Sequence, residues 1–150
     1  MKLVAAIVLS TSALLVVPAA QAQFAKAEDA IKYRKSAMTL MFTHFSRVAA
    51  MANGRVPFDA KVVADNAAVA DAISKLPWPA FVEGSDKGQT MAKPEIWSNA
   101  AKFKETNEKL QVEMSKLAAA AKTGNLDAIK AAVSATGGTC KTCHDAFRSE

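Results

Sequence analysis

The C-terminal end of the chain holds the one motif whose residue types and spacing indicate a specific chemistry. It reads Cys140-Lys141-Thr142-Cys143-His144, the C-x-x-C-H pattern of covalent haem attachment. Residues three and four apart on a helix share one face, so Cys140 and Cys143 can each form a thioether with one haem vinyl group while His144 approaches the iron. The motif predicts one covalently attached haem c per chain, with His144 as the metal ligand.

Two other uses of a C-x-x-C pair compete with haem attachment. A thioredoxin-type dithiol normally lies near a βαβ pattern, which this sequence lacks. A zinc site normally takes four ligands, and the chain has no second cysteine pair. Haem attachment is therefore the preferred interpretation.

The position of the motif restricts the second axial ligand of the iron. Only six residues follow His144, so a methionine ligand downstream of the motif is excluded. A sixth ligand must come from upstream, either from His44 or from a methionine. Met38 falls on the core face of the first predicted helix, where we expect it to pack over the distal side of the ring, because methionine commonly fills irregular cores. Iron ligation by Met38 is the alternative.

Residues 1–22 have the layout of a secretory signal peptide: Lys2, an apolar run of ~15 residues, and a small-x-small cleavage site at Ala20-Gln21-Ala22. A membrane span would need roughly 20 apolar residues. The sequence therefore predicts export to the periplasm, with residues 23–150 as a single domain. Removing Lys2 leaves 18 basic and 14 acidic residues, a net charge of +4. No basic run with interleaved aromatic residues is present, so we expect neither nucleic acid nor a membrane as a partner.

Four segments of the mature chain show a helical period. They span approximately residues 26–52, 58–76, 94–121 and 126 to near the end, and glycine or proline separates them. In the turn between the third and fourth segments, we expect Gly124 just after the third helix and Asn125 as the N-cap of the fourth. Apolar residues alternate at intervals of four and three, which predicts an all-α, antiparallel four-helix bundle.

The same spacing predicts which helix faces are buried. In the fourth helix, Gly137-Gly138 conflicts with a continuous helix, and we expect close approach to a neighbouring helix or ring there in preference to a break. The expected core faces of the first two helices consist of Ile31, Met38, Phe42, Phe45 and Ala49, and of Val62, Asn66, Val69, Ile73 and Leu76.

His44 lies away from the core face of the first helix. It belongs to a second seam on that helix, and a helix with two apolar seams usually has two partners. We therefore interpret His44 as an interface residue toward a second copy of the chain and not as an iron ligand. The seam consists of Tyr33, Ala37, Leu40, His44, Arg47 and Met51.

At this point the whole mature chain resembles the cytochrome c′ family. The resemblance includes Leu76-Pro77-Trp78 at the end of the second helix and the C-terminal C-x-x-C-H motif followed by an aromatic and a basic residue. Further matching segments are residues 23–26, 28–34 and 93–97.

The resemblance implies a homodimer whose chains each carry one five-coordinate, high-spin haem, with His144 as its sole protein ligand. It implies that Met38 caps the open distal face, that small gases such as nitric oxide and carbon monoxide bind there, and that Arg34 and Lys35 approach the haem edge and propionates. Arg148 matches a basic residue beside the histidine. The alternative for Arg148 is a solvated cation at a helix C-terminus, where the helix dipole favours positive charge.

The haem motif and the resemblance suggest two functions. The first is binding of small gases, with sequestration of nitric oxide, because an apolar distal wall without a hydrogen-bond donor disfavours dioxygen and tolerates nitric oxide. The second is periplasmic electron transfer to an unknown redox partner. We do not expect an enzyme, because peroxide cleavage needs a distal base and a charge stabiliser and no distal histidine is evident.

Overall fold

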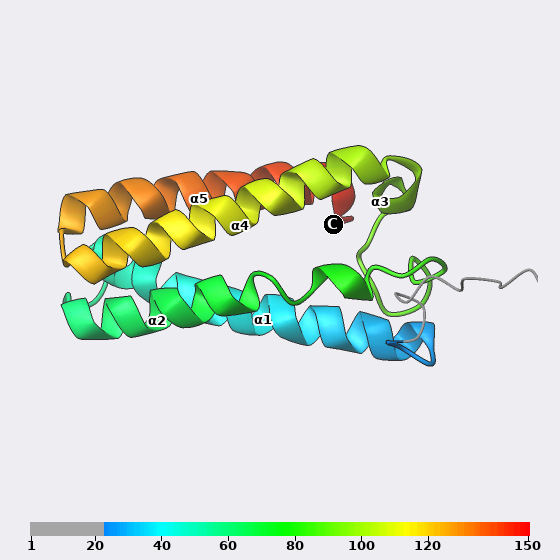
Figure 1. The fold of residues 1–150 in the computed structure, drawn as a ribbon, viewed down its shortest axis with the longest axis horizontal. Helices are drawn as coiled ribbons and strands as arrows, with labels where there is room; N and C mark the ends of the chain where they lie inside the picture. Colours follow the sequence, from blue (N-terminus) through cyan, green and yellow to red (C-terminus); the bar gives the residue numbers. More distant parts are fainter. Residues whose placement is uncertain (1–22) are drawn as a thin grey trace, which may run out of the picture.

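The computed structural model describes residues 23–150, and the predicted signal peptide, residues 1–22, lies outside them. Four long helices run alternately in opposite directions (Figure 1), which confirms the predicted all-α, antiparallel four-helix bundle. None of the helices in the described part of the chain is both long and apolar enough to cross a membrane. The long helices are α1 (Ala27–Ala52), α2 (Ala60–Ile73), α4 (Ala100–Thr123) and α5 (Leu126–Phe147). Between α2 and α4 lie a short 3₁₀ helix, η2 (Trp78–Ala80), and a single helical turn, α3 (Glu95–Ser98).

Local side-chain chemistry sets several of the helix ends. The Asp59 side chain accepts a hydrogen bond from the Val62 N–H and caps α2. Asn125 caps α5 by accepting from the Ala128 N–H, and Gly124 ends α4 at a φ of 66°, a left-handed conformation that glycine adopts without steric cost. Both residues of the tight turn between α4 and α5 therefore have the predicted roles.

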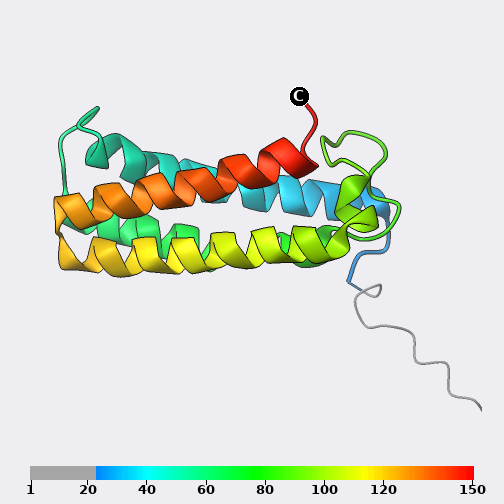
Figure 2. The ribbon, with the colours of Figure 1, turned by 90° about the horizontal axis from the view of Figure 1, so that it is seen from above.

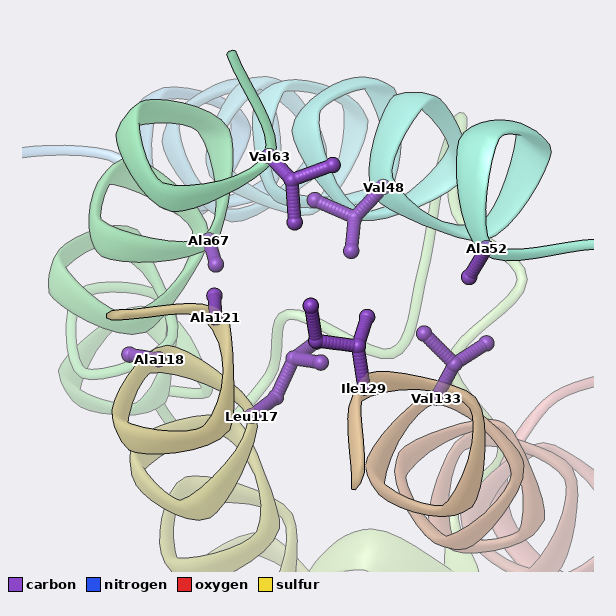
Figure 3. Packing of buried hydrophobic residues seen from close by; sticks show 9 residues of the cluster. All are labelled: Val48, Ala52, Val63, Ala67, Leu117, Ala118, Ala121, Ile129 and Val133. Atoms are coloured by element: carbon purple, nitrogen blue, oxygen red, sulfur yellow. The ribbon is translucent and has the colours of Figure 1, made fainter. Parts of the chain in front are cut away.

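All four long helices contribute to the main core (Figure 3). Nine buried side chains meet there, and Leu117 and Ile129 are fully buried. Burial of one such side chain stabilises the fold by about 1.5–3 kcal/mol. Several of the nine are alanines, which let the helices approach closely. The nine residues are Val48, Ala52, Val63, Ala67, Leu117, Ala118, Ala121, Ile129 and Val133.

The buried face of α2 was predicted wrongly. Val62, Val69 and Leu76 are 37%, 39% and 46% exposed, so these three members of the predicted stripe lie on the outer side, whereas Ile73 packs on a buried apolar cluster. Two of the three inner residues are alanines, which allow α2 to pack closely against α1 and α4. On α1, Phe42 was also expected in the core and is 66% exposed. The buried residues of α2 are Val63, Ala67 and Ala70.

One predicted helix differs from expectation in its continuity, and another matches it. The third segment breaks at Asn99, so α3 and α4 are separate. The fourth continues through Gly137 and Gly138 without interruption. A Cβ at Gly137 would meet the Phe45 ring at 4.0 Å, whereas one at Gly138 would have nothing within 4 Å. A distance of 4.0 Å is ordinary van der Waals contact, so in the described part of the chain neither glycine is needed for close approach of a neighbouring helix.

Candidate functional site

Cys140, Cys143 and His144 lie on the last two turns of α5. These turns are at the end of the bundle where α1 begins and where the segment between α2 and α4 forms its loops (Figure 2). Both cysteines are free thiols and half-buried, and His144 is exposed. The structure therefore brings the two attachment sites and the imidazole together on one helix end.

Each cysteine packs against a different apolar cluster. Cys140 contacts a cluster whose buried members are Met41, Ala70, Leu110 and Met114, with Met38, Phe45, Ile73 and Trp78 packed on it. Cys143 contacts a cluster formed by Ile96, Phe103 and Phe147, with Trp78, Phe81, Ala92 and Trp97 packed on it. Trp78 belongs to both and joins them into one wall.

Aromatic residues from α4, α5 and the segment between α2 and α4 pack against one another in this wall. The Phe103 ring lies 4.9 Å from Phe81 and 5.3 Å from Phe147, both edge-to-face. The indole N–H of Trp78 donates to the Ser74 carbonyl oxygen at 2.6 Å, and that of Trp97 donates to Phe81 at 3.1 Å. Phe81 was not predicted to belong to the site, because a loop residue carries no helical periodicity.

Burial and neighbouring charge set the protonation of the three motif residues. Burial raises the pKa of the Cys140 thiol, and the neighbouring Cys143 raises it further. Burial also raises the pKa of Cys143, which a hydrogen bond with Thr106 partly opposes. The thiols are therefore protonated at neutral pH, unlike the low-pKa cysteines of dithiol redox proteins. Partial desolvation of the imidazole lowers the pKa of His144, and the charge of Arg148 lowers it further, while Asp145 opposes this shift; the net change favours the neutral imidazole that binds metals.

Among the candidates for a distal ligand, Met38, Met41 and Met114 lie in or against the apolar cluster that contacts Cys140. Met38 packs against the same apolar cluster as Cys140. His44 is bonded elsewhere: its Nδ1 lies 2.8 Å from Asn66 Oδ1. The Asn66 amide nitrogen donates to Val62, so its oxygen faces the imidazole and accepts a hydrogen bond from the His44 Nδ1–H.

Arg34 is almost fully buried, at 3% exposure. Its guanidinium donates to Ala80 O at 3.0 Å and to Ser85 O at 2.6 Å. It also donates to Ser85 Oγ and Thr90 Oγ1, and it lies 4.6 Å from the centroid of the Phe81 ring. Burial lowers the pKa of Arg34, and Asp86 opposes this. The residue holds the loop after η2 against α1, while its approach to a haem propionate stays a prediction.

The other two basic site residues lie on the surface. The Lys35 ammonium donates to the Gln89 carbonyl oxygen at 3.0 Å, so it contacts the same loop as Arg34. Arg148 is the exposed C-cap of α5, and its guanidinium donates to the Met91 sulfur at 3.3 Å. Arg148 thus lies one turn from His144 at the negative end of the helix dipole, a position that suits either expected role.

The residues present fit haem c. Two free thiols and an imidazole have the required spacing on one continuous helix. Apolar and aromatic side chains surround both thiols, as a large hydrophobic ring requires. The protonated thiols can add to vinyl groups, and the neutral imidazole can bind iron.

Comparisons with known proteins agree with this site. The sequence profile of the family described as Cytochrome C' matches residues 29–148. Cytochrome c' of Rubrivivax gelatinosus is 56% identical over 129 residues, which is 85% of this chain and 100% of the relative. Its crystal structure superposes with a TM-score of 0.82, with the same shares covered. A nitric oxide complex of a mutant of cytochrome c prime from Alcaligenes xylosoxidans has a TM-score of 0.80 at 47% identity, covering 85% of this chain and 99% of that one.

Proposed function

Because this chain belongs to the cytochrome c′ family, whose members carry covalently attached haem c, we propose that it binds small gases in the periplasm and sequesters nitric oxide there. Haem, when bound, supplies an iron that can change oxidation state and take an exogenous ligand. Cys140 and Cys143 hold the ring, and His144 provides one axial ligand. The remaining residues of the site decide whether the opposite axial position stays open.

The observation that carries this proposal is the engagement of His44 with α2. The chain contains two histidines, and the hydrogen bond from His44 to Asn66 keeps one of them from the iron. His144 is then the only imidazole available. We therefore expect that a bound haem would keep one open position at its iron, unless a methionine such as Met38 occupied it.

The side chains on the Cys140 side favour nitric oxide over dioxygen. Met38 and its neighbours Met41 and Phe45 are apolar and carry no strong hydrogen-bond donor. Bound dioxygen gains charge and needs such a donor, whereas nitric oxide does not. The nitric oxide complex of the Alcaligenes xylosoxidans relative supports the same choice of ligand.

The test is an absorption spectrum of the purified holoprotein in its ferric, ferrous and ferrous carbon monoxide forms. We expect a high-spin ferrous spectrum that shifts when carbon monoxide is added. A low-spin ferrous spectrum that ignores the gas would contradict an open axial position.

Electron transfer is the second candidate function, and the placement of Met38 favours it specifically. The Met38 side chain packs on the same cluster as Cys140, so its thioether is an alternative ligand. Replacement of Met38 by leucine keeps the apolar volume and removes the sulfur. If Met38 ligates the iron, M38L converts a low-spin haem to a high-spin one. If the position is open, M38L leaves the spin state unchanged.

We also propose that two copies of the chain associate through α1 and α2. Tyr33 and Leu40, from the predicted seam, are exposed, whereas Ala37 is buried and Met51 packs on the main core. The hydrogen bond between His44 and Asn66 joins this seam to the exposed face of α2 that carries Val62 and Val69. Sedimentation at several protein concentrations tests this proposal. L40E should give a monomer, while a monomeric parent protein would contradict it.

Export and the lack of an enzymatic activity complete the proposal. We expect the protein recovered from the periplasm to begin at Gln23, which N-terminal sequencing determines. With His44 bonded to Asn66, no imidazole serves as a distal base, and we expect peroxide turnover no faster than that of free haem. Peroxide turnover faster than that of free haem would contradict this expectation and indicate an enzyme.

A further inference from the structure

The last turn of α5 is held by residues 90–93, which we call the strap. We propose that Lys93, in this strap, is a positioning residue for His144: it fixes the turn from which the imidazole reaches the iron. This inference rests on the proposed function only in requiring His144 to be the axial ligand. It concerns how this chain holds that ligand in place.

Lys93 satisfies two carbonyl groups at the C-terminal end of α5. Its backbone N–H donates to Phe147 O at 3.0 Å, and its ammonium donates to Asp145 O at 3.1 Å. The last four carbonyls of a helix have no partner within the helix. An ammonium is also favourable at the negative end of the helix dipole. Lys93 therefore caps, from another part of the chain, the turn that begins at His144.

The rest of the strap adds contacts to the same turn. Ala92 and Arg148 form an antiparallel bridge, and the Ser149 N–H donates to Met91 O at 2.9 Å. Arg148 also donates to the Met91 sulfur. Residues on both sides of Phe147 are thus tied to the strap, so the end of α5 is held at several points beyond His144.

The strap is in turn anchored to α1. The hydroxyl oxygen of Thr90 accepts from the Ala92 N–H at 3.1 Å and from the Arg34 guanidinium at 2.9 Å. Arg34 is buried and lies one turn before Met38 on α1. A continuous set of contacts therefore connects α1, which carries Met38, with the turn that carries His144.

Loss of the Lys93 ammonium should loosen this turn and let the imidazole rotate. We would compare K93M with K93R, which keeps a cation, and with K87M, which removes an exposed lysine from the same inter-helix segment. All three are used as holoproteins. The first measurement is amide hydrogen exchange over residues 144–149. The second is the hyperfine-shifted proton resonances of the His144 β-methylene group in the ferric form, which report imidazole orientation in either spin state.

In K93M we expect exchange about five- to tenfold faster at the end of α5, as the loss of one hydrogen bond predicts, together with a changed separation of the two β-methylene resonances. K93R and K87M should match the parent protein. T90V, which removes the anchor to Arg34 without changing charge, should move both readouts in the same direction as K93M.

The outcomes separate the positioning role from its alternatives. Faster exchange in K93M with unchanged resonances would make Lys93 a helix cap only and would overturn the proposal, as would no change in either measurement. If K93M does not yield holoprotein, T90V decides by the same two readouts. Failure of the proposed gas binding appears separately, in the carbon monoxide spectrum of the unaltered protein.

Discussion

Replacing Arg34 with methionine should destabilise the protein more than the same replacement of any exposed lysine or arginine. Arg34 is 3% exposed, and its guanidinium bonds to Ala80 at the end of η2 and to Ser85 and Thr90 in the loop after it. Methionine keeps most of the apolar volume beside Phe81 but leaves the buried carbonyl oxygens of Ala80 and Ser85 without a donor. The loop would then lose its attachment to α1.

The magnitude follows from two opposing contributions to the free energy of unfolding. Each hydrogen bond to a charged donor contributes about 1.5–3 kcal/mol, and Arg34 makes four of them. Burying the guanidinium costs several kcal/mol, and this cost disappears in the variant. Loss of the contact with Phe81 adds about 0.5–2 kcal/mol. The expected net loss for R34M is about 2–4 kcal/mol.

Urea unfolding of the holoprotein, followed by far-ultraviolet circular dichroism at one fixed protein concentration, measures this loss. The control is R47M, which removes an exposed arginine from the same helix and should change the free energy of unfolding by less than about 0.5 kcal/mol. The slope of free energy against urea should stay the same in both variants. If R34M and R47M have the same midpoint, the hydrogen bonds of Arg34 do not hold the loop, and our account of this residue is wrong.

Three further predictions concern the bundle itself. L117A should cost about 2–5 kcal/mol, because Leu117 is fully buried in the main core. In urea unfolding, V112A on the exposed side of the same helix should cost little. N125A should cost about 0.5–2 kcal/mol by removing the cap of α5, and an unchanged midpoint would refute that role. G124A should cost about 1 kcal/mol, since alanine is strained at a φ of 66°. Thermal unfolding measures this cost, and a G124A midpoint equal to that of the parent protein would contradict it.

Features with local causes were predictable from the sequence. The roles of Gly124 and Asn125 depend on backbone conformation and on a hydrogen bond three residues away, so neighbouring residues are sufficient to recognise them. The continuity of α5 through Gly137 was harder to predict. Glycine opposes a helix there locally, and the packing of Phe45 against this position is a contact between distant segments.

The burial of α2 shows where local reasoning failed. Periodicity predicts that a helix has an apolar face, and here two such faces exist one residue apart. Periodicity favoured the face of Val62 and Val69, whereas the packed helices bury the other face, which carries Val63 and Ala67. That choice depends on where α1 and α4 pack against α2, which periodicity does not encode.

By itself, the amino-acid sequence determined the attachment chemistry, because Cys140, Cys143 and His144 acquire their geometry from helical spacing alone. It also determined the four-helix architecture, because the alternation of apolar residues is local. Only the tertiary structure decided what surrounds that motif. Arg34 meets Thr90 across 56 residues, and Arg148 meets Met91 across 57. Such contacts form only after the helices have packed, so no pattern of neighbouring residues encodes them.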